Sequence, residues 1–169
     1  MKAALPFFRA QRSGTIVNIS SVGGIRARPA FGGYSTSKFG LEGLSECVAE
    51  EVAPFNIRVL LVEPGSFRTN FLGAFQYAAA GTSSYYKGTA VDNALHGYGD
   101  KDGKQPGDPE KAAQRIVDVV LGRGMGAGKS QYLRLPLGRD CVLQIREKIS
   151  SLEENLEAME KIASSTDFQ

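Results

Sequence analysis

A tyrosine and a lysine are spaced for proton-transfer chemistry in the run Tyr34-Ser35-Thr36-Ser37-Lys38. In a helix, residues four apart lie on the same face, one turn from each other. Free tyrosine has a pKa of about 10 and is a poor acid or base at neutral pH. A nearby ammonium stabilises the phenolate, and each unit of pKa decrease corresponds to about 1.4 kcal/mol. Tyr34 is therefore predicted to exchange a proton with a carbonyl or alcohol oxygen.

Two further groups are placed to hold that oxygen. Ser20 and Ser21 follow one buried-strand pattern, and the run Pro64-Gly65-Ser66-Phe67-Arg68-Thr69 follows the next. The carboxyl ends of parallel strands meet at the edge where open α/β sheets bind ligands. We expect a serine hydroxyl there, with free backbone groups in the second segment. Without these neighbours, Tyr34 and Lys38 would be interpreted as an ordinary pair on a helix surface.

The predicted elements bring these residues to one edge. Residues 15–20 and 57–62 are almost continuously apolar and rich in β-branched side chains, as in strands buried on both faces. Residues 34–53 have a helical period and end at Pro54, and a third strand is predicted over 131–135. Strand, helix and strand with short joints form the βαβ unit of a parallel sheet. The apolar stripe of the helix comprises Leu41, Leu44, Val48 and Val52.

The remaining segments are less regular. Residues 1–12 are typical of the end of a helix, and Asp108 with Pro109 predicts a helix start that leads to Leu121. Residues 66–108 are rich in glycine and lack sustained periodicity, which is typical of a functional loop or lid that covers the substrate. Its tyrosines either line a substrate pocket or pack the loop, and both interpretations remain open: Tyr77, Tyr85, Tyr86 and Tyr98.

The last helix is expected over 139–163. Its apolar residues recur at alternating intervals of three and four: Val142, Ile145, Ile149, Leu152, Leu156 and Met159. Three heptads barely reach the length that indicates a coiled coil, so we interpret this seam as packing on its own domain.

Composition excludes several classes of function. The 169 residues are 42% hydrophobic and 22% charged, as in one folded domain, and the net charge of +2 does not favour a nucleic-acid partner. No apolar run reaches the roughly 20 residues of a membrane span. Cys47 and Cys141 fit no metal-ligand spacing, which predicts no metal and reduced thiols in a cytoplasmic protein.

Two other features are interpreted as unrelated to catalysis. Residues 122–130 resemble a phosphate loop, but Arg123 occupies the place of the first Walker glycine, and the segment lies between a predicted helix and a predicted strand. Phosphate loops need the reverse order, so we expect a flexible turn. His96, the only histidine, is expected to be an exposed loop residue.

Taken in order, the motifs Asn18-Ile19-Ser20-Ser21, Y-x-x-x-K at Tyr34 and P-G-x-x-x-T at Pro64 resemble the short-chain dehydrogenase/reductase family. The resemblance implies hydride transfer between NAD or NADP and a small carbonyl/alcohol pair. Ser21 matches the serine that binds the substrate oxygen, and Tyr34 matches the general acid/base. Lys38 matches the lysine that lowers the tyrosine pKa and binds the nicotinamide ribose. The segment that matches the family's nicotinamide-binding run, mostly through backbone, contains Pro64, Gly65, Phe67 and Thr69.

The resemblance covers the catalytic half of the family's pattern. Met1 corresponds to the late part of a helix before the serine strand, so the glycine-rich turn that receives the pyrophosphate is not found in these residues. We therefore expect a single partial Rossmann-like α/β domain over 1–169, with three parallel strands and flanking helices. The choice between NAD and NADP is not encoded here. The alternative hypothesis is a catalytically inactive fragment or interaction module. The resemblance also implies a homo-oligomer through the 34–54 helix.

Overall fold

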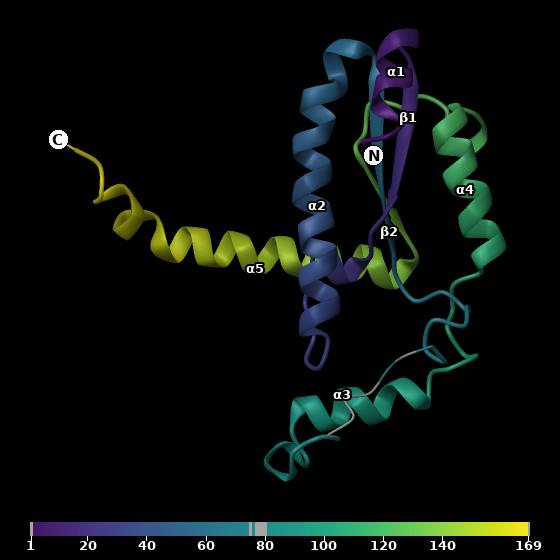
Figure 1. Cartoon of the computed structure of the whole chain (residues 1–169). Helices are drawn as coiled ribbons and strands as arrows, with labels where there is room; N and C mark the ends of the chain where they lie inside the picture. The colour runs from purple at the N-terminus through teal and green to yellow at the C-terminus, as the bar shows by residue number, and fades with distance from the viewer. Residues whose placement is uncertain (1, 75, 77–80, 169) are drawn as a thin grey trace.

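The computed structural model contains a three-stranded parallel sheet and describes residues 2–74, 76 and 81–168. β1 (Gly14–Ile19) pairs along its whole length with β2 (Ile57–Pro64), and β2 pairs with β3 (Arg134–Leu137) (Figure 1). The predicted parallel sheet is confirmed. β3 begins three residues later than the predicted third strand. Residues 131–133 form a turn and a bend, although the Leu133 carbonyl already accepts from Leu61 N–H of β2 at 2.8 Å.

One helix covers each face of the sheet, as Figure 1 shows. On one face, α2 (Gly32–Val52) packs Val48 and Val52 against Ile57 and Val59. On the other, α4 (Pro109–Leu121) packs against the alternate β2 residues. Because successive side chains of a strand point to opposite faces, β2 must be apolar on both, which explains its continuous hydrophobic run.

The buried face of α2 differs from the predicted stripe. Val48 and Val52 are buried as expected, but Leu41 is half-buried and Leu44 is exposed. Polar side chains face inward in the earlier turns of the helix: Ser35, Glu42 and Ser45. The Ser45 hydroxyl accepts from Asn18 Nδ2 at 2.8 Å and donates to the Leu41 carbonyl at 2.6 Å. These polar contacts, absent from a hydrophobicity pattern, rotate the buried face away from Leu44.

The other helices confirm most of the predicted boundaries. α1 (Leu5–Gln11) is the helix expected near the start, and α4 begins where Asp108 predicted it. The Asp108 carboxylate accepts from the N–H groups of Lys111 and Glu110, and these bonds lower its pKa. α3 (Ala90–Gly99) lies within the region expected to be a loop, beyond the end of the strands (Figure 1).

α5 (Arg139–Ser164) contradicts the interpretation that its apolar seam packs on its own domain. Only Cys141 and Gln144 are buried on this helix, and its second half extends past α2 and away from the sheet (Figure 1). The seam is instead largely exposed, because a helix of 26 residues is longer than the width of the three-stranded sheet beside which it begins. Among the described residues, no helix is long and apolar enough to cross a bilayer.

A cluster of charged side chains joins three elements inside the molecule. Arg134 of β3 forms ion pairs with Glu42 and Glu46 of α2 and with Glu63 of β2. Burial raises the pKa of Glu63, and the bond to Arg134 only partly opposes this effect. Burial also disfavours the Arg134 charge, but the bonds to the three carboxylates outweigh it and raise the pKa of Arg134. The cluster thus fixes α2 against the carboxyl end of β2.

Replacing Arg134 with Met should lower the free energy of unfolding by about 3 kcal/mol at neutral pH, since buried carboxylates would lose their counter-charge. The folded-state pKa of Glu63 is raised above its unfolded value, so protonation favours the folded chain. The variant should therefore recover stability as the pH falls through that pKa. Urea unfolding at pH 7 and pH 5 measures both effects.

Glu46→Gln, at an exposed carboxylate of the same cluster, is the control and should change stability by less than about 1 kcal/mol. Equal losses in both variants would contradict the assignment.

The two cysteines should differ in reactivity. Burial raises the pKa of the Cys141 thiol to about 12, and its Sγ donates to the Glu63 carbonyl at 3.0 Å, whereas Cys47 is exposed. Because the thiolate is the reactive species, a disulfide reagent at neutral pH should titrate one thiol in the folded chain and two in denaturant. Cys47→Ser should leave none in the folded chain. Rapid native labelling of Cys141 would contradict its placement.

Candidate active site

The two serines that follow β1 have different environments. Ser20 is buried, and its N–H donates to the Val62 carbonyl at 2.7 Å, which continues the sheet. Ser21 is half-buried and begins the short 3-10 helix η1 (Val22–Gly24), where its Oγ accepts from Gly23 N–H at 3.0 Å. The Ser21 hydroxyl therefore keeps its own proton available for a ligand, while the Ser20 side chain lies beneath the surface.

Tyr34 and Lys38 lie in the first two turns of α2, facing Ser21 and the end of β1. Lys38 Nζ donates to the Ile19 carbonyl at 2.9 Å and lies 5.8 Å from the centroid of the Tyr34 ring. Both residues are half-buried. One hydrogen bond leaves the other N–H groups of the ammonium available. The carbonyl at the end of β1 thus holds the lysine beside the tyrosine.

Gly23 permits the close approach of the serine and the tyrosine. A Cβ at this position would lie 3.0 Å from Tyr34 Cε1 and 3.4 Å from Ser21 Oγ. Both atoms are therefore within van der Waals contact of one point, with no side chain between them. The structure brings together all three residues predicted to be catalytic.

Aromatic rings adjoin the phenol of Tyr34. The ring centroid of Phe71 lies 5.6 Å from that of Tyr34 and the centroid of Phe31 lies 6.0 Å from it, both in edge-on geometry, and the Tyr98 ring of α3 lies tilted against Phe31 at 4.6 Å. Of the tyrosines with two open interpretations, Tyr98 therefore reaches this site. Tyr85 and Tyr86 are exposed, and Tyr77 falls outside the described residues.

The segment after β2 lies at the same edge, but its amides are not free as the sequence predicted. Gly65 N–H donates to the Leu137 carbonyl and Ser66 N–H to Asp140 Oδ2, both at 2.8 Å. Thr69 N–H donates to the Phe67 carbonyl at 2.9 Å. β3 and α5 pack against this segment and use the N–H groups of Gly65 and Ser66, and the segment's own Phe67 carbonyl uses that of Thr69. The Ser66 carbonyl accepts from Gly107 N–H and the Thr69 hydroxyl accepts from Phe71 N–H at 3.3 Å, so a ligand would use the second lone pairs of the carbonyls and the hydroxyl proton of the exposed Thr69.

Phe67 and Pro64 have largely structural environments. Phe67 packs against the cluster of Leu60, Val62 and Val119 beneath α4. Pro64 ends β2 opposite Leu137. Any contact of these two residues with a ligand must therefore involve their backbone or an exposed edge of the ring.

Sequence reasoning missed Asp140, which shapes the segment after β2. Its carboxylate binds Ser66 N–H and approaches Gly65 so closely that a Cβ there would lie 2.3 Å from Oδ1. Asp140 belongs to the first turn of α5, 74 residues from Ser66. No local motif connects the two, and an acidic residue at a helix start has the alternative explanation of favouring the helix dipole.

His96 is exposed as expected, although it lies in α3 rather than in a loop. Residues 122–130 connect α4 to β3, and Gly122 ends α4 with a φ of +63°. The segment is therefore a helix-to-strand turn. Among the described residues, no group of three or more metal-ligating side chains is found.

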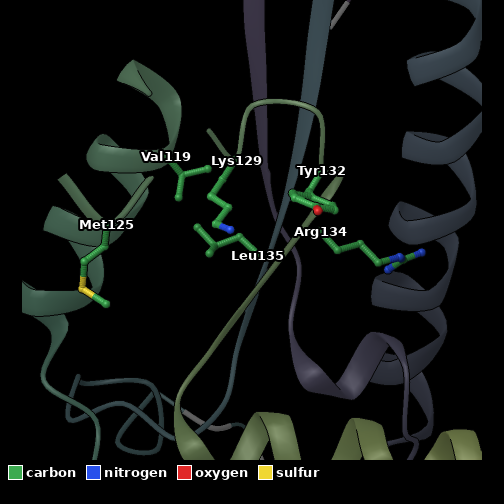
Figure 2. A pocket seen from close by; sticks show the side chains of 6 residues that line it. All are labelled: Val119, Met125, Lys129, Tyr132, Arg134 and Leu135. Atoms are coloured by element: carbon green, nitrogen blue, oxygen red, sulfur yellow. The ribbon is translucent and has the colours of Figure 1, made fainter. Parts of the chain in front are cut away.

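A small hollow adjoins this turn, with a volume of about 180 Å³ (Figure 2). Its lining is mainly apolar, and Figure 2 shows the Arg134 guanidinium directed away from it, toward α2. Lys129 is the remaining cation of the lining. This geometry does not favour a phosphate site, and the hollow lies apart from Tyr34 and Lys38.

Known proteins resemble this chain in both sequence and structure. The sequence model of the short chain dehydrogenase family matches residues 1–78. An uncharacterized oxidoreductase of Bacillus subtilis is 32% identical over 148 residues, which is 85% of this chain and 50% of that protein. The crystal structure of a short-chain dehydrogenase from Streptomyces avermitilis superposes with a TM-score of 0.83 at 38% identity, over 99% of this chain and 58% of its own. The chain belongs to the short-chain dehydrogenase family.

A more distant member of the short-chain dehydrogenase family has the same fold. The enzyme from Burkholderia cenocepacia, solved in complex with NADP, is 21% identical, with a TM-score of 0.55 over 93% of this chain and 51% of its own. The present chain spans between 26% and 50% of the length of four curated relatives that it matches. The family and the partial Rossmann-like fold predicted from the sequence are both confirmed.

Replacing Gly65 with Ala should destabilise this short-chain dehydrogenase by about 2 kcal/mol, because the new methyl group would displace Asp140 from Ser66. Gly43→Ala is the control. Nothing lies within 4 Å of a Cβ at Gly43, so this variant should be neutral or more stable by up to about 1 kcal/mol. Chemical denaturation of both variants tests the contact. An unchanged midpoint for Gly65→Ala would contradict it.

Proposed function

We propose that this chain carries the catalytic residues of an NAD(P)-dependent oxidoreductase that acts on a small carbonyl/alcohol pair. The observation that carries the proposal is that Ser21 and Tyr34 meet at the side-chain-free position of Gly23, while Lys38, held by the Ile19 carbonyl, lies 5.8 Å from the Tyr34 ring. Family membership supports oxidoreductase chemistry. In this proposal, Tyr34 is the general acid/base, and Ser21 and Lys38 position the reactants.

Each residue would act at a specific atom. The Ser21 hydroxyl, which accepts from Gly23 N–H, would donate to the substrate oxygen. The Tyr34 phenol would give a proton to that oxygen during reduction and take it back during oxidation. Lys38, held by the Ile19 carbonyl, would favour the phenolate by its charge.

The residues present also fit one end of a nicotinamide cofactor. The unused N–H groups of Lys38 suit ribose hydroxyls, and carbonyls between Pro64 and Phe67, with the Thr69 hydroxyl, suit a carboxamide. The amides of Gly65 and Thr69 already have partners, so the carboxamide would be bound chiefly by acceptors and by that hydroxyl. When bound, the cofactor supplies or accepts the hydride.

Cofactor binding is the first test. The 169-residue chain is titrated with NADH and with NADPH, while nicotinamide fluorescence and thermal stability are followed. Saturable binding at micromolar concentration with a rise in melting temperature is expected, and Thr69→Val should weaken it. Glu154→Gln, at an exposed residue of α5, is the control. Absence of binding by either probe would contradict cofactor use by this chain and favour the inactive-module alternative.

Tyr34→Phe tests the chemical step. With any carbonyl substrate that the chain reduces, this variant should lower kcat by at least about 100-fold, since general acid catalysis is lost, and leave the cofactor dissociation constant within about twofold. Tyr86→Phe, at an exposed tyrosine, should leave both unchanged. Retained turnover in Tyr34→Phe would end the assignment of Tyr34.

A further inference from the structure

α5 has an apolar seam from Val142 to Met159 that the described part of the chain leaves largely exposed. Five residues of the seam are between 39% and 68% exposed: Val142, Ile149, Leu152, Leu156 and Met159. Figure 1 shows the second half of α5 extending beyond α2. A contiguous exposed apolar surface on a projecting helix is typical of an interaction site.

We propose that α5 pairs with α5 of a second copy of this chain in an antiparallel coiled coil. The alternating spacing of three and four residues from Val142 to Met159 is that of the two core positions of a heptad. In the antiparallel register centred between residues 150 and 151, Ile149 lies opposite Leu152 of the second copy. Ile145 then lies opposite Leu156, and Val142 opposite Met159, so every layer is apolar.

The charges beside the seam identify a second copy as the occupant. One flanking position recurs every seven residues and is occupied in turn by Arg139, Arg146, Glu153 and Glu160. All four are exposed, and none forms an ion pair within the described part of the chain. The charge of the side chains in this row therefore changes from positive to negative at the middle of the seam.

A row of two positive and two negative side chains is complementary to itself when reversed. In the antiparallel register, Arg146 faces Glu153 of the second copy and Arg139 faces Glu160. The two-fold axis repeats each pair, which gives the self-complementary surface of a symmetric dimer. In a parallel pair, the same row would leave only Lys148 opposite Glu153, so the charges favour the antiparallel arrangement.

The contacts of α5 with its own body leave this face accessible. Cys141 and Gln144 are buried, and Arg28 Nη2 donates to Gln144 Oε1 at 2.5 Å. Val142 and Leu143 on the same turn are exposed, as is Ile149 two turns after Val142. The body therefore holds one side of the first turns of α5, and the seam lies beside that contact rather than under it.

The first experiment measures the mass of the full 169-residue chain by sedimentation equilibrium. A dimer is expected. Leu152→Glu with Leu156→Glu should raise the dimer dissociation constant at least about 100-fold, and the monomer should stay folded because both leucines are exposed. Leu143→Glu, at an exposed leucine outside the seam, should leave the dimer intact. Circular dichroism confirms that each variant is folded.

A charge exchange then tests the orientation. Arg146→Glu alone should weaken the dimer about tenfold through like charges, and Arg146→Glu combined with Glu153→Arg should restore it. Recovery by Lys148→Glu with Glu153→Lys, in place of that pair, would overturn the antiparallel register. A monomer at all concentrations, or a dimer unaffected by the leucine substitutions, would overturn the proposal. None of these residues belongs to the proposed catalytic site, so the result is independent of turnover.

Discussion

The burial of β2 on both faces is the constraint on which the rest of the structure depends. Leu60, Leu61 and Val62 are almost inaccessible, because α2 and α4 cover opposite faces and β1 and β3 pair along the edges. A strand in this position orders every neighbouring element by apolar burial and backbone pairing. It also fixes where the strand ends, and therefore where the candidate active site can form.

Polar groups then define how that end is built. Glu63 is buried beside Arg134, which connects β3 to α2, and the Glu63 carbonyl accepts from Cys141 of α5. A buried carboxylate requires such partners, since an unpaired charge in the interior is costly. The same cluster lies one helical turn beyond Lys38, through Glu42. The position of the lysine therefore depends on the packing of α2 as well as on its bond to Ile19.

Close backbone approach is the second requirement of the site. Gly23 allows Tyr34 and Ser21 to share one small space, and Gly65 allows Asp140 to reach the segment after β2. Both contacts need a residue without a side chain, although both glycines have ordinary backbone angles. The role of these glycines in the packing is thus steric, and single methyl groups are sensitive probes of it.

The sequence by itself determined the parallel sheet, the helix bounds near Asp108 and Arg139, and the placement of Ser21, Tyr34 and Lys38 at one edge. These features follow from local periodicity, capping and the rule that parallel strands end together. Only the tertiary structure decided that Glu42 and Ser45 face inward while Leu44 is exposed, because buried polar partners leave no hydrophobic pattern. It likewise decided that the amides of Gly65 and Ser66 are used and that the α5 seam lies exposed. Each depends on contacts between segments far apart in the chain, which no local spacing encodes.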